Sequence, residues 1–367
     1  MTSRRYAISL VVVAAVMFIG TIATNLIVDP QGVFGSPFFT GHLNPNMRYA
    51  RYVSYKRQAA DVQGLIFGSS RGYAIDPEVV RHYIPQAGRY LNVSMPHGLL
   101  TDHLPLLEYI LHDKDGRGQA IKNVLLLLDL DLFGDPPWTN VNIDAFLPPE
   151  MGLESAPRFW WRYLTAVQMR SWRDTIYVSR VLTRLGIRPD LTMQLDRVAP
   201  TRASRFAVPL PRSATLSLVN DATEAAPPLP KFAGPDPGIG GNVKAEDRRA
   251  FNAVRPDFEH QVALFARFAQ LCRDHGIRLT VLTSPLQRYA LDGFAPADLQ
   301  RVLDRLGRFA AIWDFTTQGD IADRSSLWRD SSHFHNVVGD MMLSSAFAGG
   351  SSAAATHFGR LIPQAGP

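Results

Sequence analysis

The sequence predicts an α/β protein with a doubly wound parallel sheet behind a single N-terminal transmembrane helix. Apolar residues make up 46% of the 367 positions and charged residues 19%, which is enough for a substantial core. Short apolar runs alternate with helical patterns along the chain, as is typical of parallel βαβ units. A long charge-free stretch near the N-terminus adds a membrane segment to this picture.

The N-terminal stretch is long enough to cross a bilayer. "MTSRR" is followed by residues 6–28, which carry no charge. At about 1.5 Å per residue, a helix over 7–28 covers the ~30 Å hydrocarbon core. "ATN" at 23–25 is a poor cleavage site, so an uncleaved signal anchor is favoured over a cleaved signal peptide. Arg4 and Arg5 favour a cytoplasmic N-terminus, which places residues 30–367 outside the membrane, in the periplasm of a bacterium.

Strands and helices then alternate. The apolar run 122–134 reads as a strand buried on both faces, and Asp76 with Pro77 reads as a helix N-cap and first position. Gly276 closes a later amphipathic helix. The expected strands lie at 62–67, 88–95 (ending near Ser94), 122–134, 277–285 and 312–316, and the expected helices at 76–84, 100–113, 257–276, 298–310 and within 330–347.

An insertion interrupts this pattern from about 135 to 247. Its first part, around "RFWWRY" at 158–163, predicts helices packed over one edge of the core or, alternatively, a surface on lipid headgroups or a membrane partner that uses Trp160, Trp161 and Arg162. Five prolines within 227–237 indicate a long loop or linker. The expected organisation is a cytoplasmic stub (1–5), an anchor (6–28), a lead-in (29–60), an extracytoplasmic domain (61–348) and a tail (349–367).

Charge and cysteine content exclude several function classes. The net charge of +5 comes almost wholly from arginine, and no dense basic run with interleaved aromatics suggests nucleic-acid binding. The single cysteine, Cys272, excludes an intrachain disulfide and every multi-cysteine metal site. Its apolar, helix-like surroundings predict a buried structural thiol.

Ser70 is the best candidate nucleophile. It lies in "GSSRG" (68–72), which matches the G-x-S-x-G elbow of α/β-hydrolases. A strand that breaks into a turn before a helix exposes a hydroxyl at the carboxyl end of a parallel sheet, beside free backbone N–H groups. Because Ser70 follows the first strand of the domain rather than a central one, the elbow match is interpreted as coincidental.

A serine needs a base, and His333 is the best of the ten histidines. Asp330 lies three residues before it, so one loop presents a carboxylate to one ring nitrogen and leaves the other for Ser70. The structural alternatives are that Ser70 is only a turn residue and that Asp330 is only a helix cap. His335 would add an H-x-H metal pair, but no third ligand is evident and no metal or cofactor is expected.

These blocks resemble a known family. Gly68-Ser69-Ser70 with Asp330-Ser331-Ser332-His333 is similar to the SGNH (GDSL-type) hydrolase superfamily, and closest to its membrane-tethered alginate O-acetylation proteins and DltD-like D-alanylation proteins. The "LDLFG" after the third strand also fits. The resemblance implies a flavodoxin-like sheet over roughly 60–135 and 255–348, with Ser70 as nucleophile, His333 as general base and acid, and Asp330 as the orienting carboxylate.

The resemblance also implies an oxyanion hole, where this sequence departs from the family pattern. The Ser70 N–H and a glycine after the second strand would donate to the oxyanion. Gly98 is that glycine, but it lies about one residue from the expected place, so His97 is the alternative at this position. The family's asparagine after the third strand is replaced by Asp131, which is expected to fix the Ser70 loop or bind Arg71 because a carboxylate repels an oxyanion. Asn92 is a candidate substitute donor. A missing donor favours a slow or specialised enzyme.

The resulting hypothesis is a serine-dependent O-acyltransferase or esterase that acts on a cell-surface or secreted polysaccharide, with acetyl as the expected acyl group. A transferase would need a membrane partner, of the MBOAT type by family resemblance, to supply the acyl group. The alternatives are an inactive subunit that scaffolds a polysaccharide synthase or export complex, and an esterase directed at lipids.

Overall fold

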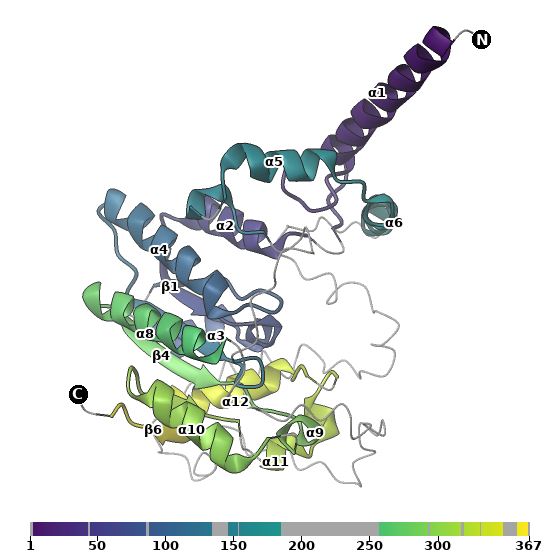
Figure 1. Cartoon of the computed structure of the whole chain (residues 1–367). Helices are drawn as coiled ribbons and strands as arrows, with labels where there is room; N and C mark the ends of the chain where they lie inside the picture. Colours follow the sequence, from purple (N-terminus) through teal and green to yellow (C-terminus); the bar gives the residue numbers. More distant parts are fainter. Residues whose placement is uncertain are drawn as a thin grey trace. The chain divides into compact units, whose positions relative to one another are not determined.

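In a computed structural model of the chain, six strands form one sheet in the order β2-β1-β3-β4-β5-β6. Figure 1 shows the whole chain with its helices around this sheet. The first five strands are parallel, and β6 is antiparallel to β5. Their bounds are β1 Val62–Phe67, β2 Arg89–Asn92, β3 Asn123–Leu128, β4 Arg278–Thr283, β5 Ile312–Asp314 and β6 Arg360–Ile362. The structure describes residues 3–42, 45–85, 88–133, 146–152, 154–184, 257–292, 294–316, 319–330, 332–347 and 358–365.

The expected α/β class and the five parallel strands are confirmed, with one addition. The C-terminal segment was expected to be a tail, but Arg360–Ile362 pairs with β5 as an antiparallel edge strand. Its Arg360 guanidinium lies 3.3 Å from the buried carboxylate of Asp314 on β5. The second strand ends at Asn92, two residues before the predicted Ser94.

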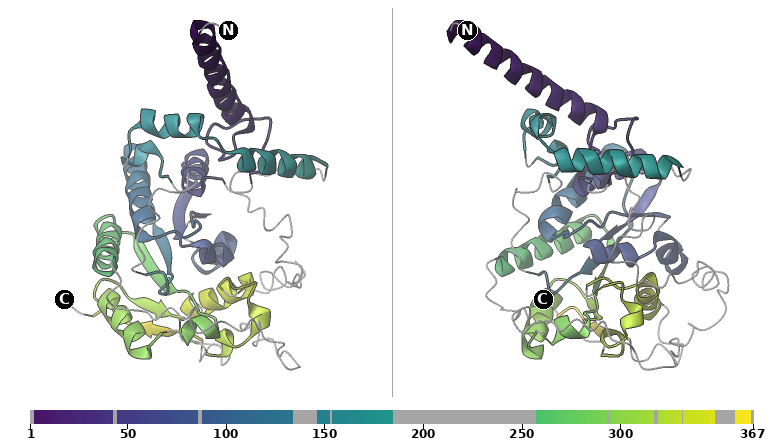
Figure 2. Two further views of the ribbon diagram at one scale, coloured as in Figure 1. Left: turned by 45° about the vertical axis from the view of Figure 1, so that its right-hand side comes forward. Right: turned by 90° about the vertical axis from the view of Figure 1, so that its right-hand side faces the viewer.

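Helices cover both faces of the sheet, because successive strand residues point in opposite directions (Figure 2). On one face, Ile66 of β1 packs in a buried cluster with Val80 of α3 (Pro77–Tyr83) and Met342 of α12 (Asn336–Phe347). On the other face, the next residue, Phe67, packs against the ring of Phe268 of α8 (Phe258–Asp274). The core therefore consists of two apolar layers with the strands between them.

The helices of this sheet unit fall close to their predicted ranges. Asp76 caps α3, where its carboxylate accepts a hydrogen bond from the N–H of Glu78 at 2.8 Å, and Gly276 follows α8 with a φ of 63°. Cys272 is fully buried, as expected, and burial raises the pKa of its thiol to about 12. The helices are η1 Ser70–Ala74, α3 Pro77–Tyr83, α4 Leu100–Gly116, α8 Phe258–Asp274, α9 Arg288–Leu291, α10 Pro296–Gly307, α11 Gly319–Ala322, η8 Ser325–Leu327 and α12 Asn336–Phe347.

A second compact unit combines the N-terminal 57 residues with residues 138–205. It holds α1 Ser3–Val28, α2 Met47–Gln58, η4 Pro149–Met151, α5 Ala156–Thr165 and α6 Met169–Arg184. With 26 residues, α1 is long and apolar enough to cross a membrane. Phe159 and Tyr163 of α5 form a small buried core with Val33.

The aromatic segment belongs to this unit. Its predicted helices are α5 and α6, and both pack against α1. Their predicted place, over one edge of the core or on lipid headgroups or a membrane partner, stays a prediction. Asn25 of α1 donates hydrogen bonds of 2.9 Å to the carbonyls of Leu164 and Ala166, and accepts one of 2.7 Å from the indole of Trp172. The predicted linker at 227–237 lies outside the described residues.

Candidate active site

The Ser70 turn lies at the carboxyl end of β1. Gly68 ends the strand, and Ser69 caps the short helix η1 by accepting a hydrogen bond from the Arg71 N–H at 3.1 Å. Ser70 is the first residue of η1, so its own N–H has no partner within that helix. The local sequence thus presents a half-exposed hydroxyl together with a backbone donor at the sheet edge.

The His333 loop is held by buried aromatic side chains. Trp328 and Phe334 pair across an isolated β-bridge, and both rings are buried. Within the loop, the Arg329 N–H donates to the His333 carbonyl at 2.7 Å. The Asp330 carboxylate accepts the backbone N–H groups of Ser332 and His333 at 2.8 and 2.9 Å. One aspartate therefore shapes the loop and faces the imidazole.

Ser70, His333 and Asp330 lie in one hydrogen-bonded chain. The Ser70 Oγ is 2.8 Å from the His333 Nε2, and the His333 Nδ1 is 2.9 and 3.0 Å from the two Asp330 oxygens. A carboxylate at Nδ1 favours the tautomer with its proton there, which leaves the Nε2 lone pair facing the hydroxyl. Such an arrangement can remove the serine proton during attack on an ester carbonyl.

The Asp330 carboxyl is strongly held in its charged form. Burial raises its pKa, but the hydrogen bond and charge of His333 and the two backbone N–H groups outweigh that effect and lower it to about 2. The neighbouring His335 ring is different, since burial and then the charge of Arg329 lower its pKa. Asp330 is therefore ionised throughout the pH range in which a histidine works as a base.

Arg71 ties the two halves of the site together. Its Nε donates to the Ser332 carbonyl at 2.7 Å, and its two terminal nitrogens form a bidentate pair with Asp131 at 2.5 and 2.7 Å. Further bonds reach the hydroxyls of Ser332 and Ser284 at 3.0 and 3.4 Å. These contacts occupy all five guanidinium N–H groups.

The Arg71 guanidinium is buried and remains charged. Its side chain is only 5% exposed, and Asp129 lies 3.3 Å away in addition to Asp131. Burial works against the charge, but the two carboxylates outweigh it and raise the pKa of Arg71. The predicted pairing of Asp131 with Arg71 is confirmed. The structure does not support a substrate-binding role for Arg71, because its guanidinium has no N–H group left to donate to a substrate.

The two other predicted oxyanion donors are corrected by the structure. The Asn92 amide donates to the carbonyls of Gly72 and Ile75 at 2.8 and 3.0 Å, which uses both of its N–H groups. The Gly98 N–H donates to the Met95 carbonyl at 2.9 Å. Asn92 therefore anchors the turn after Ser70. The Ser70 N–H remains a donor of the predicted set, and the alternative donor at His97 stays a prediction.

Gly98 and Gly72 matter for packing instead. A Cβ on Gly98 would lie 2.7 Å from the His103 ring and 3.0 Å from the Gly68 carbonyl. A Cβ on Gly72 would overlap the Ser94 hydroxyl after β2. Both glycines let the segment after β2 approach the Ser70 turn, so Gly72 has an importance that the sequence interpretation did not give it.

The sequence interpretation missed Ser332, Ser284 and Asp129, which complete the Arg71 network. Ser284 donates to Asp129 at 2.5 Å and follows β4, whereas Asp129 follows β3. Their position directly after apolar strands was the available signal, because carboxyl ends of parallel strands converge on one edge.

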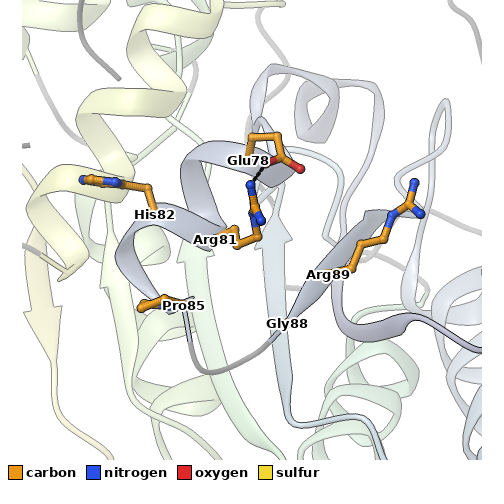
Figure 3. A pocket seen from close by; sticks show the side chains of 6 residues that line it. All are labelled: Glu78, Arg81, His82, Pro85, Gly88 and Arg89. Atoms are coloured by element: carbon orange, nitrogen blue, oxygen red, sulfur yellow. Dashed lines mark hydrogen bonds and ion pairs between the residues drawn. The ribbon is translucent and has the colours of Figure 1, made fainter. Parts of the chain in front are cut away.

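Other parts of the described chain offer no comparable chemistry. No group of three His, Cys, Asp or Glu side chains among the described residues is arranged to hold a metal ion. A hollow of about 700 Å³ lies along α3 and the start of β2, at the opposite end of that strand from Asn92 (Figure 3). Its Arg81 is paired with Glu78, and Arg89 lies 3.9 Å from Asp61, so each of these arginines faces an exposed carboxylate.

Comparison with known proteins adds no family assignment. A scan against protein-family models finds no match for this chain, and a search of curated proteins finds no significant similarity. The sequence motifs and the geometry of the site are therefore the observations that indicate a function.

Proposed function

We propose that this protein is a membrane-anchored, extracytoplasmic O-acyltransferase or esterase of the SGNH type. The observation that carries the proposal is the hydrogen-bonded chain from Ser70 through His333 to Asp330. The strand order β2-β1-β3-β4-β5 supports it, because this is the order of flavodoxin-like doubly wound sheets. An N-terminal helix able to span a membrane supports the anchor.

The chemistry would proceed in two steps. His333 Nε2 takes the Ser70 proton while Oγ attacks the acyl carbonyl, and the same proton then passes to the departing oxygen of the donor. This leaves an acyl-Ser70 ester. In the second step His333 deprotonates a sugar hydroxyl or water, which attacks the ester and releases Ser70 with its proton restored. Asp330 stabilises the imidazolium formed in both steps.

Transfer rather than hydrolysis requires that the acceptor hydroxyl displace water at the acyl-enzyme. The substrate class, a cell-surface or secreted polysaccharide with acetyl as its substituent, comes from the resemblance of the Ser70 and Asp330–His333 blocks to polymer-acylation proteins. An extracytoplasmic site would receive its acyl group through a membrane partner, for which an MBOAT-type acyltransferase is the candidate.

A second candidate function is a non-catalytic subunit of a polysaccharide synthesis or export complex. The observation that favours it is the engagement of Asn92 and Gly98 in other hydrogen bonds. Loss of one oxyanion donor costs about 10²–10³-fold in rate in other hydrolases. A slow enzyme and a scaffold are therefore the two functions that need to be separated.

Labelling with a fluorophosphonate probe separates them. Peptide mass spectrometry should place the label on Ser70, and Ser70→Ala should abolish both labelling and polymer acylation. Ser155→Ala, which changes an exposed serine whose side chain makes no cap hydrogen bond, is the matched control. An unlabelled Ser70 in folded protein, together with normal acylation by Ser70→Ala cells, would establish the scaffold instead.

A further inference from the structure

The exposed, charge-free part of α1 is too short to cross a bilayer. The part of α1 that packs against other helices must therefore lie partly within the membrane. Residues Ser3 to Gly20 are all exposed, and half-buried or buried residues begin at Thr21. The charge-free part of the exposed segment, from Tyr6 to Gly20, is about 22 Å long at 1.5 Å per residue. A hydrocarbon core of about 30 Å leaves roughly 8 Å, or five more residues, to be supplied by the packed part of α1.

Those five residues reach Asn25, and the helices bound to Asn25 must therefore lie at the membrane boundary. The Asn25 amide contacts the end of α5 and the indole of Trp172 in α6. Deeper along α1, the Phe18 ring lies 5.9 Å from that of Trp161. Tilting of α1 would shorten its reach and bring α5 and α6 further into the leaflet. Figure 1 shows both helices beside the C-terminal end of α1.

The outward side chains of α5 and α6 suit this location. Four large apolar residues remain exposed on these helices and on the link between them, which we call the lipid-facing patch: Trp161 (57%), Val167 (69%), Met169 (73%) and Tyr177 (68%). By contrast, Trp160 is partly buried and packs on Phe34 and Tyr49. Trp and Tyr are the side chains enriched where a bilayer meets water.

The charges around the patch fit lipid phosphates. Between residues 154 and 184 six arginines accompany two acidic residues, and the arginines are Arg158, Arg162, Arg170, Arg173, Arg180 and Arg184. Arg170 and Arg173 are 89% and 74% exposed and share one partner, Asp174. Exposed pairs of this kind are weak in water, so they can exchange for phosphate.

We infer that α5 and α6 lie in the outer-leaflet interface of the membrane that α1 crosses, with the lipid-facing patch inserted and the arginines at headgroup level. The inference rests on the membrane anchor of the proposed function and goes beyond it. It assigns this protein a two-part attachment, a spanning helix and an interfacial helix pair joined through Asn25.

Spin-label accessibility in vesicles tests this inference. The full chain is reconstituted in vesicles of phosphatidylethanolamine and phosphatidylglycerol, with single spin-labelled cysteines at Val167, Met169 or Tyr177. Cys272 is fully buried, and unsubstituted protein controls for its labelling. Labels in the patch should be more accessible to oxygen, which concentrates in lipid, than to a water-soluble nickel complex.

Two further labels make the outcomes distinguishable. Val11→Cys reports on α1, and Leu361→Cys places a label at an exposed apolar position on β6 that should show the aqueous pattern. A lipid pattern at Val11 with an aqueous pattern at the patch overturns the inference and leaves the anchor intact. An aqueous pattern at Val11 refutes the anchor and the inference together, without bearing on Ser70. Patch labels shielded from both reagents would show a second copy of the chain as the occupant and would also overturn it.

Discussion

The two units of this chain use buried polar side chains differently. In the sheet unit, polar groups from the ends of several strands converge on Arg71, and the network holds Ser70 beside His333. In the unit that contains α1, here called the anchor unit, the buried Asn25 amide joins α1 to α5 and α6, whereas the buried Asp29 carboxylate accepts backbone N–H groups of the loop that follows α1. The charge of Arg71 thus fixes a geometry between strands, whereas the neutral, fully bonded Asn25 amide is compatible with lipid. Each unit can therefore be perturbed separately.

The largest effect is expected on reactivity, from Asp330→Asn. The amide still offers an oxygen to the backbone N–H groups of Ser332 and His333, but its nitrogen cannot accept the proton of the imidazole. By analogy with serine proteases, the wrong tautomer should lower the rate of fluorophosphonate labelling by about 10⁴-fold. Because Asp330 is 53% exposed, the thermal stability should change little.

The pH dependence gives a second readout at Asp330. Its lowered pKa means that the contribution of the ionised carboxylate to stability is complete above about pH 4 and is lost as the pH falls through about 2. Asp330 therefore stays ionised between pH 5 and pH 8, because this range lies above both its lowered pKa and the unperturbed value of about 3.9. Its titration should not lower the rate of Ser70 labelling in this range. The control is Asp323→Asn, at an exposed ion pair with Arg288. Normal labelling by Asp330→Asn would contradict its assigned role.

The next largest effect is expected on the stability of the sheet unit, from Arg71→Met. The change leaves Asp131 and Asp129 without their buried cation and should cost about 3–5 kcal/mol. Hydrogen exchange should show loss of protection in peptides of β1 and β3, with α5 and α6 unchanged. The matched control is Arg81→Met, at an exposed pair with Glu78, where the change should be within about 0.5 kcal/mol. Equal effects at the two positions would refute the argued role of the network.

A smaller effect, confined to the anchor unit, is expected from Asn25→Leu. The substitution preserves volume but deprives the Leu164 and Ala166 carbonyls and the Trp172 indole of their partner. The loss should be about 1–3 kcal/mol, seen as faster exchange in α5 and α6 and no change in Ser70 labelling. Thr24→Val is the control, because the Thr24 hydroxyl bonds only the Gly20 carbonyl of its own helix. Unchanged protection in α5 and α6 would show that the amide does not join these helices.

A similar or smaller effect in the sheet unit is expected from Gly339→Ala. A Cβ there would overlap the Ala74 carbonyl, so α12 would shift from the end of the Ser70 turn at a cost of about 1–3 kcal/mol. Because α12 follows the His333 loop, labelling of Ser70 should also slow. Gly116→Ala in α4 is the matched control, since no atom lies within 4 Å of its added Cβ. It should be neutral or slightly stabilising.

The same contrast explains what the sequence could predict. Residues 65–67 and 124–128 are apolar runs followed by turn residues, so the strands that contain them were evident. The pairing of Asp330 with His333 was equally accessible because it is local. By contrast, Arg360–Ile362 is short and exposed, and it becomes a strand only through pairing with β5.

Hydrogen bonds formed only in the folded structure account for the site residues that were predicted wrongly. Asn92 follows a strand as an oxyanion donor would, but the carbonyls of the Ser70 turn occupy its amide. The Arg71 partners come from positions up to 261 residues away. Asp129 and Ser284 could be indicated only by their place directly after strands, and Ser332 lies in the His333 loop without even that signal. The attachment of α5 and α6 to α1 likewise joins segments separated by 139 to 147 residues.

The smallest effect is expected from Asp340→Asn in α12, and it tests how the sheet unit tolerates uncompensated charge. Burial, and then the charge of Asp76, raise the pKa of the Asp340 carboxyl to about 7. The folded chain therefore keeps a proton that the unfolded chain releases near pH 4, so this group's contribution to stability is complete below about pH 4 and is lost as the pH rises through 7. Asp340→Asn cannot ionise, and its stability relative to the parent should increase from about pH 4 to pH 7 and stay constant above. Because the carboxyl is only partly buried, we expect a gain of about 1 kcal/mol at pH 8, or about 2–4 °C in Tm. Asp61→Asn, at a 70% exposed position, should show no such trend. If the stability difference between Asp340→Asn and the parent did not change with pH, the Asp340 carboxyl would be ionised in the folded protein. The sheet unit would then stabilise a second buried negative charge besides the carboxylates paired with Arg71.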